Sequence, residues 1–216
     1  NHEKDIYKKI YSFEWKKILN PNKTFLIKTK LKSQVFKNSN YCTLKIKDAI
    51  VDNLRSEFGK RPSINKIDPD IILSVIVKNK QIKIYIDSSG VPLFKRGYRS
   101  KIHKASLNES LAAGLILLSN WDRISPFYDI MCGSGTIPIE ATMMAHNIPA
   151  GIFRNTFGFQ KWDNYDRKLW EKIRMKANYK IDFESEIPIY GSDYFKRNIE
   201  LAKQNAKAIN INKKIY

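Results

Sequence analysis

The sequence has few of the residues that stabilise secreted or metal-bound small proteins. Its 216 residues include two cysteines, Cys42 and Cys132, which are too few for a disulfide framework and show no zinc-site spacing. The three histidines (His2, His103 and His146) are scattered, and we expect no metal site. These features favour a reducing compartment, so we predict a cytoplasmic location.

Long apolar runs are also missing. No stretch approaches the roughly 18–20 apolar residues that cross a bilayer, so we expect no membrane anchor. The first residues, NHEKDIYKKI, are charged, lack the apolar core of a secretion signal and lack methionine. We therefore expect the chain to begin inside a longer protein. Hydrophobic residues make up 43% of the chain, which is enough for a packed core rather than disorder.

Acidic residues are scarce, above all in the first half. Residues 1–104 contain 24 lysines and arginines against 9 acids, whereas residues 105–216 contain 15 against 12. A general compositional bias toward lysine would raise the net charge of both halves equally. The uneven charge therefore favours a polyanion, most often nucleic acid, as the partner of the first half. A solvated basic surface is the alternative.

Patterns in the first half predict a small α/β unit. Residues 24–31 partly alternate and predict a strand. Apolar residues recurring every four positions predict a helix over residues 44–59, which glycine and then proline end. Two β-rich runs, residues 71–77 and 81–87, flank a short polar turn and predict a hairpin.

Residues 89–105 have the glycine, proline and basic content of a connector. We therefore place one domain at residues 1–88 and a second at residues 106–216. The basic residues of the connector and one arginine further along are candidate phosphate contacts: Lys95, Arg96, Arg99, Lys101, Lys104 and Arg154.

The second half alternates helices and strands. Ser106 and Glu109 form a capping box that predicts a helix start. The predicted inner face of this helix consists of Leu107, Leu111, Leu115 and Leu118. Further elements are a strand ending at Asp129, helices over residues 136–147 and 166–177, a strand over residues 187–190, and a closing helix whose inner face is Phe195, Ile199, Ala202 and Ala206.

The stretch DIMCGSGTIPIE, Asp129–Glu140, predicts a strand, a glycine turn and a helix. Such a turn points backbone amides at an anion, and glycine allows close approach of a ligand. A nucleoside triphosphate would need a lysine after the second glycine, and none follows Gly135. A dinucleotide would need a third glycine where Pro138 stands. S-adenosylmethionine and an ordinary strand–helix turn remain.

A second carboxylate favours S-adenosylmethionine. Asp193 follows the predicted strand at residues 187–190, where it could hold ribose hydroxyls. It lies 58 residues after Gly135, whereas about 20 is usual in dinucleotide folds. The pairing therefore requires residues 147–186 to be an insertion.

Several segments together resemble a known family. DIMCGSGTIPIEATMMAHNIPAG and FGFQKWDNYD are similar to the THUMP-containing RNA methyltransferases, especially those that methylate guanine N2 in large-subunit ribosomal RNA. LKIKDAIVDNLRSEFGKRPSI resembles their THUMP region and LFKRGYR their interdomain segment. Phe157–Trp162 resembles the family's insert, and Ile130 departs from the usual proline.

The resemblance implies an α/β protein: a partial THUMP-like RNA-binding region, then the first part of a Rossmann-like class I methyltransferase domain. It implies S-adenosylmethionine as cofactor and structured RNA, in particular ribosomal RNA, as substrate. The residues implied for the cofactor are Asp129, Cys132, Gly133, Ser134, Gly135, Thr136 and Asp193. Glu140, Asn108 and Glu109 are further candidates, with packing or helix capping as the alternative.

The family's catalytic Asn/Asp-Pro-Pro-Tyr/Phe motif does not occur in the chain. We therefore expect it beyond residue 216 and name no catalytic residue. A binding module with a non-catalytic cofactor fold, or a methyltransferase acting on tRNA or DNA, are the alternatives. We also expect the insert's aromatics, Phe157, Phe159 and Trp162, to emerge near the ligand edge of the second sheet, either stacking on bases or packing as core.

Overall fold

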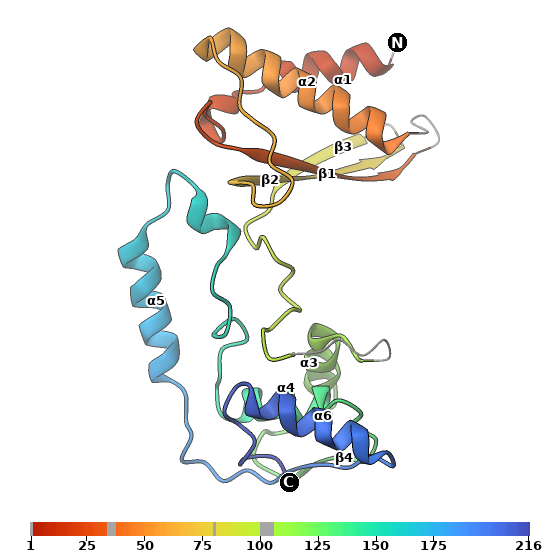
Figure 1. Cartoon of the computed structure of the whole chain (residues 1–216), viewed down its shortest axis with the longest axis vertical. Helices are drawn as coiled ribbons and strands as arrows, with labels where there is room; N and C mark the ends of the chain where they lie inside the picture. Colours follow the sequence, from red (N-terminus) through yellow and green to blue (C-terminus); the bar gives the residue numbers. More distant parts are fainter. Residues whose placement is uncertain (1, 34–37, 80, 100–105) are drawn as a thin grey trace. The chain divides into compact units, whose positions relative to one another are not determined.

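A computed structural model describes residues 2–33, 38–79, 81–99 and 106–216 (Figure 1). It divides into two compact units, which are described separately. Unit 1 contains residues Asn1–Val91 and Thr156–Tyr165, and unit 2 contains Pro92–Asn155 and Asp166–Tyr216. In the described part of the chain, no helix combines the length and the hydropathy needed to cross a bilayer.

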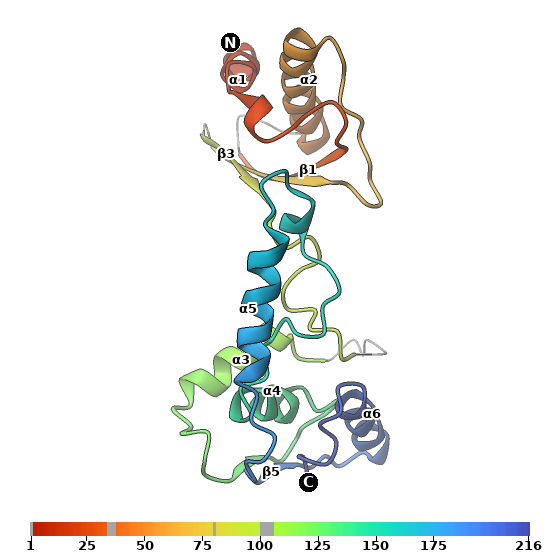
Figure 2. The same cartoon turned by 90° about the vertical axis from the view of Figure 1, so that its left-hand side faces the viewer.

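Unit 1 is a three-stranded sheet with helices on one face. Its elements are α1 (His2–Tyr11), η1 (Trp15–Lys17), β1 (Phe25–Lys32), α2 (Ser39–Phe58), β2 (Ile71–Lys78), β3 (Gln81–Ile86) and, from far along the chain, η2 (Gly158–Lys161). The strand order is β1-β2-β3, with β1 parallel and β3 antiparallel to β2. The helices α1 and α2 lie on the same side of the sheet in two perpendicular views (Figures 1 and 2).

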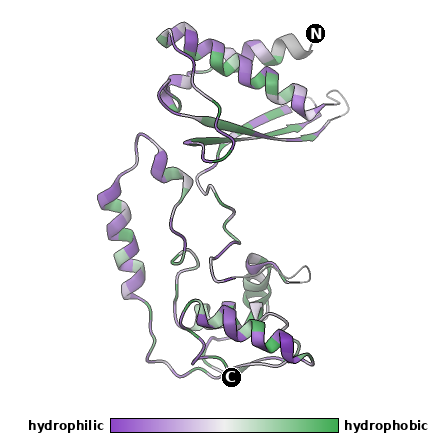
Figure 3. Ribbon diagram, viewed as in Figure 1, coloured by the Kyte–Doolittle hydropathy of each residue, from purple (hydrophilic) through white to green (hydrophobic). Residues whose placement is uncertain are grey.

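Alternation along the strands builds the core of unit 1. Phe25, Leu73 and Val75 are fully buried on the face that meets the helices. The opposite positions are polar or partly exposed, so burial alternates along each strand. Figure 3 maps the hydropathy of the residues onto the ribbon. The predicted first strand and hairpin are confirmed.

The helix α2 begins earlier than predicted because a cap outside the apolar pattern starts it. The Asn38 side chain accepts hydrogen bonds from the amides of Asn40 and Tyr41, at 2.9 and 3.1 Å. The helix ends as predicted at Gly59, whose φ of 67° is left-handed. The helix α1 was not predicted.

Unit 2 has two short parallel strands and four helices: α3 (Glu109–Leu118), β4 (Phe127–Asp129), α4 (Thr136–Ala145), α5 (Arg167–Tyr179), β5 (Ile189–Gly191) and α6 (Lys196–Lys207). Helix α4 is buried between α3, the strands and α6, through Ile139, Ala141 and Met143. Tyr216 pairs with β5 through two backbone hydrogen bonds. Its amide donates to the Ile189 carbonyl at 2.8 Å, and its carbonyl accepts from the Gly191 amide at 2.8 Å.

Two predictions about α3 are wrong. The N-cap is Asn108, whose side chain accepts from the Leu111 amide at 3.1 Å, rather than Ser106. Three of the four leucines expected inside are exposed: Leu111, Leu115 and Leu118 are 53%, 46% and 78% exposed. The buried face consists of Glu109, Ala112, Ala113 and Ile116. Small residues allow α3 to approach α4 closely, and this contact decides which face is buried.

Candidate functional site

The ends of β4 and β5 meet, and backbone hydrogen bonds join the loops that follow them. Asp129 pairs with Gly191 in the parallel register. Beyond that pair, the Ser192 amide donates to the Asp129 carbonyl at 2.9 Å, and the Cys132 amide donates to the Ser192 carbonyl at 2.8 Å. The glycine loop is therefore fixed against the neighbouring strand at the carboxyl edge of the sheet, where open α/β sheets bind ligands.

Two left-handed glycines shape the turn from β4 into α4. Gly133 has a φ of 54° and Gly135 a φ of 79°. A Cβ at Gly135 would lie 2.8 Å from Ala202 Cβ, so glycine also allows the close approach of α6. Gly135 is the N-cap of α4 and offers no side chain to its first amides. The start of the helix is thus available to an anionic group.

Asp193 holds this turn in place. One carboxylate oxygen accepts from the Gly133 amide at 3.0 Å. The other accepts from the Phe195 amide and the Asn198 side chain, each at 2.9 Å. These bonds to the ionised form lower the pKa of Asp193, with the Phe195 amide as the largest cause. In the structure this carboxylate joins the glycine loop to the beginning of α6.

An open hollow of about 620 Å³ lies beside the loop. Its lining residues come from the α3 approach, the glycine loop and α6: Ser106, Leu107, Asp129, Met131, Cys132, Gly133, Ser134, Thr136, Ile137, Asn198 and Leu201. Burial, and to a lesser extent the charge of Asp193, raise the pKa of Asp129 above its usual value. An ammonium group in this hollow would compensate the Asp129 charge.

The remaining loop side chains supply polar and apolar lining. Burial raises the pKa of the Cys132 thiol to about 11, so this group is a neutral wall rather than a nucleophile. The Ser134 hydroxyl lies 3.2 Å from that of Ser106. The Thr136 hydroxyl accepts from Arg99 at 2.7 Å.

Glu140 and Glu109 lie outside the hollow and hold the connector. Glu140 is 2% exposed and receives the guanidinium of Arg96 at 3.3 Å and the hydroxyl of Tyr98 at 3.2 Å. Burial raises the pKa of Glu140 despite that arginine. Glu109 lies 3.3 Å from the Arg99 guanidinium. The structure therefore places these two acids in packing contacts, and Asn108 in the α3 cap.

The predicted basic contacts are mostly engaged within unit 2. Arg96 and Arg99 pair with the acids just described, and Arg99 also donates to the Leu107 carbonyl. Arg154 is 8% exposed and donates to the Pro92 carbonyl at 2.9 Å. Lys95 is exposed. The other two candidates, Lys101 and Lys104, lie outside the described residues.

The aromatic part of the insert, Thr156–Tyr165, packs on unit 1. Its expected position near the ligand edge of the second sheet stays a prediction. Trp162 lies against the unit 1 core. Lys161 pairs with Asp68 at 2.5 Å, and Lys23 with Asp163 at 2.6 Å. The two residues of each of these ion pairs are far apart in the sequence, so no local sequence pattern predicts the pairs.

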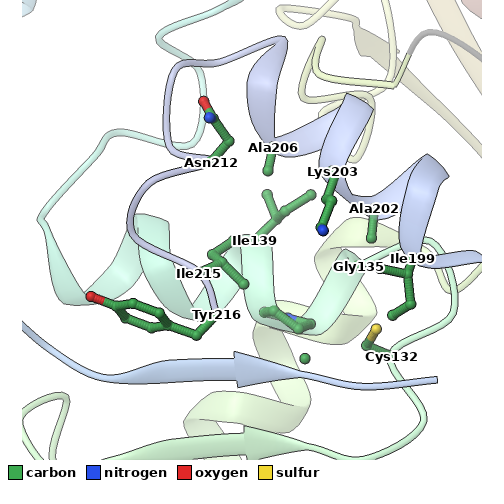
Figure 4. Close-up of a pocket in the computed structure, with 12 residues that line it drawn as sticks. Cys132, Gly135, Ile139, Ile199, Ala202, Lys203, Ala206, Asn212, Ile215 and Tyr216 are labelled. Atoms are coloured by element: carbon green, nitrogen blue, oxygen red, sulfur yellow. The ribbon is translucent and has the colours of Figure 1, made fainter.

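A second hollow of about 430 Å³ lies between α4, α6 and β5, and its lining is mainly apolar (Figure 4). Ile139 faces Ala202 and Ala206 there. Nearby, Asn205 is 1% exposed and donates to the Ser134 carbonyl at 3.0 Å. Sequence reasoning missed Asn205, although a polar residue beside the apolar positions of α6 was a usable signal.

Comparison with known proteins identifies both halves. A family model described as the RMKL-like methyltransferase domain matches residues 96–216, and a THUMP domain model matches residues 1–87. The chain belongs to the RMKL-like methyltransferase family. This confirms the resemblance found in the sequence, and also the fold class of a THUMP region followed by a methyltransferase domain.

Relatives of this RMKL-like chain are named as enzymes of ribosomal RNA. Ribosomal RNA large subunit methyltransferase K/L of Psychromonas ingrahamii is 40% identical over 206 residues, covering 94% of this chain and 27% of that protein. Its namesake in Buchnera aphidicola is 37% identical over 211 residues, covering 95% and 30%. The chain thus spans less than a third of these two relatives.

The chain is also similar to solved structures. SMU.472, assigned as a methyltransferase and crystallised with SAH, superposes with a TM-score of 0.89 at 31% identity, covering 99% of this chain and 56% of that one. A protein from Listeria monocytogenes, assigned by prediction as an N6-adenine-specific DNA methylase, gives 0.87 at 30% identity with the same coverage.

Proposed function

We propose that the chain is part of an S-adenosylmethionine-dependent methyltransferase of large-subunit ribosomal RNA, with guanine N2 as the target. The observation that carries the proposal is the hollow beside the Gly133–Asp193 hydrogen bond in an RMKL-like domain. Relatives named for ribosomal RNA methylation and the THUMP match support the substrate class. Cytoplasmic location stays a prediction that depends on this substrate.

The lining of the hollow fits the polar ends of S-adenosylmethionine. The desolvated Asp129 carboxylate suits its ammonium group, and the uncapped start of α4 suits its carboxylate. Ser134 and Thr136 offer hydroxyls beside that end. Asp193 remains the proposed ribose partner, because a carboxylate oxygen can accept more than one hydrogen bond. When bound, the cofactor supplies a methyl group from a sulfonium to an amine nitrogen.

Calorimetry of the full protein with S-adenosylmethionine tests the cofactor assignment. Asp129→Asn and Asp193→Ala are each expected to weaken binding by roughly tenfold or more, since each removes a charged hydrogen-bond partner. Lys203→Gln, an exposed change on α6 outside that hollow, is the control. Unchanged affinity in both aspartate variants would contradict the proposed site.

The Listeria relative makes adenine N6 in DNA a second candidate. Mass spectrometry of nucleosides from ribosomal RNA, tRNA and DNA of a deletion strain separates the two. Loss of N2-methylguanosine from large-subunit RNA supports the first candidate. Loss of N6-methyladenine from DNA, with ribosomal RNA unchanged, supports the second.

A further inference from the structure

The sheet of unit 1 has a second face, opposite α1 and α2. The register of the strands aligns three rows of side chains on it: Lys28, Ser74 and Tyr85; then Lys30, Ile76 and Lys83; then Lys32, Lys78 and Gln81. Neighbouring strands lie about 4.8 Å apart, so the residues of a row are direct neighbours. We call these nine residues the lysine face. All of them except Ser74 are exposed.

The lysine face carries five positive charges and no carboxylate. Within the described residues, none of its five lysines forms an ion pair. Other lysines of unit 1 do have acidic partners, as in Lys16–Glu57, Lys47–Asp48 and Lys161–Asp68. Like charges directly opposite in a sheet are destabilising, and Lys32 stands opposite Lys78. An anionic partner would remove that repulsion.

Apolar groups lie among these charges. Tyr85 is 49% exposed, in one row with Lys28 and two positions from Lys83 on β3. Ile76 is 40% exposed in the middle row. An exposed phenol ring at the margin of a lysine cluster can stack an unpaired base while the lysines neutralise its flanking phosphates. A membrane or an acidic protein would not require an exposed aromatic ring beside the charges.

The insert does not occupy these rows. It meets the sheet at the other end, where the Phe159 amide donates to the Ser88 carbonyl at 3.0 Å and Lys161 reaches Asp68. In unit 2 the guanidiniums of Arg96 and Arg99 in the connector, and of Arg154 further along the chain, already contact protein groups. The lysine face therefore offers more available charge to a polyanion than those three arginines do.

We propose that the lysine face binds RNA that contains a single-stranded segment, with the lysines on phosphates and Tyr85 stacked on a base. This inference rests on the proposed function for its partner, because it assigns the RNA of that function to a surface of unit 1.

The test uses the full protein, a labelled oligouridylate and a duplex RNA of equal length, with affinity measured by fluorescence anisotropy over a salt series. The variant Lys28→Gln/Lys30→Gln/Lys83→Gln removes three charges from the face. The slope of log affinity against log salt is expected to become shallower by about 2, at roughly 0.7 per lost phosphate contact on a single strand. The matched control Lys8→Gln/Lys9→Gln/Lys60→Gln removes three exposed charges elsewhere in unit 1 and is expected to keep the wild-type slope.

Tyr85 is tested separately. Tyr85→Ala is expected to weaken oligouridylate binding by about tenfold and duplex binding much less, whereas Tyr85→Phe keeps the ring and the affinity. An equal loss of RNA affinity in both triple variants, or no loss in either, would contradict RNA binding by the lysine face. So would wild-type oligouridylate affinity in Tyr85→Ala.

Cofactor binding separates this inference from the proposed function. If calorimetry shows normal S-adenosylmethionine binding while the lysine-face variant keeps wild-type RNA affinity, the face is wrong and the function stands. If the wild-type protein does not bind S-adenosylmethionine, while the lysine-face variant binds RNA more weakly than the wild type, the proposed function is wrong and the lysine face stands.

Discussion

The sheets of the two units differ in strand length and in what covers them. In unit 1, β1, β2 and β3 have 8, 8 and 6 residues, and two helices cover one face, on which Phe25, Leu73 and Val75 are fully buried. In unit 2, β4 and β5 have 3 residues each, and apolar residues beside them stay open: Tyr128 is 65% and Ile130 75% exposed. Unit 1 is therefore held by side-chain burial, whereas the site of unit 2 depends more on backbone bonds and close glycine contacts.

The strongest test of this difference is Gly135→Val. The new side chain would combine a left-handed φ of 79° with a Cβ only 2.8 Å from Ala202 Cβ. We expect a loss of about 4 kcal/mol or more, confined to unit 2. Hydrogen exchange followed by mass spectrometry, unit by unit, measures it. Gly133→Ala is the control, because no described residue lies within 4 Å of the added Cβ, and only about 1–2 kcal/mol of backbone strain is expected. Equal losses in the two variants would show that the approach of α6 is unimportant.

Burial gives the second test. Leu73 is fully buried in the central strand of unit 1, so Leu73→Ala is expected to cost about 3 kcal/mol through the cavity it leaves. Leu118→Ala in α3 removes the same atoms from a side chain that is 78% exposed, and should change stability by less than about 0.5 kcal/mol. Urea unfolding measures both. A large loss at Leu118 would mean that the exposed leucine face of α3 is covered in solution.

The same contrast explains which parts were predictable from the sequence. The hairpin of unit 1 was predictable because two β-rich runs, residues 71–77 and 81–87, flank a short polar turn, and the first strand because residues 24–31 partly alternate. The buried face of α3 was not, because its leucines outweigh the small residues Ala112 and Ala113 that make the actual contact. Periodicity shows that a helix is amphipathic but does not report which neighbour is close.

The candidate site also has parts that were predictable from the sequence and parts that were not. The glycine turn and Asp129 were predictable because a strand, a left-handed turn and a helix need a particular local sequence. The ion pair of Arg96 with Glu140 and the docking of Trp162 depend on residues more than 40 positions away. No local pattern encodes such a pairing, so the roles of the connector arginines and of the insert could not be predicted.

Arg96 offers a third test, on whether the connector binds RNA or stabilises unit 2. Its guanidinium and the Glu140 carboxylate are 12% and 3% exposed. Arg96→Ala leaves that acid buried without its cation, and we expect a loss of about 2 kcal/mol, below the usual range because the arginine is not fully buried. Thermal unfolding measures it, and Arg96→Ala/Glu140→Gln should recover part of the loss. A flatter salt dependence of RNA binding at unchanged stability would instead assign Arg96 to phosphate contact.

The smallest expected effect concerns pH and the two aspartates of the site, whose pKa values shift in opposite directions. Hydrogen bonds from the Phe195 amide and the Asn198 side chain lower the pKa of Asp193, whereas burial raises that of Asp129. A lowered native pKa stabilises the fold above the unfolded value and loses that contribution as pH falls through the native one. A raised native pKa has the opposite effect: ionisation costs stability as pH rises from the unfolded pKa through the native one.

Asp193→Asn should therefore destabilise unit 2 at neutral pH and progressively less below about pH 4, whereas Asp129→Asn should be neutral or stabilising at neutral pH. Urea midpoints of the wild type and both variants between pH 3 and pH 7 measure the differences, and parallel curves for the two variants would contradict the opposite roles of these carboxylates in the glycine loop.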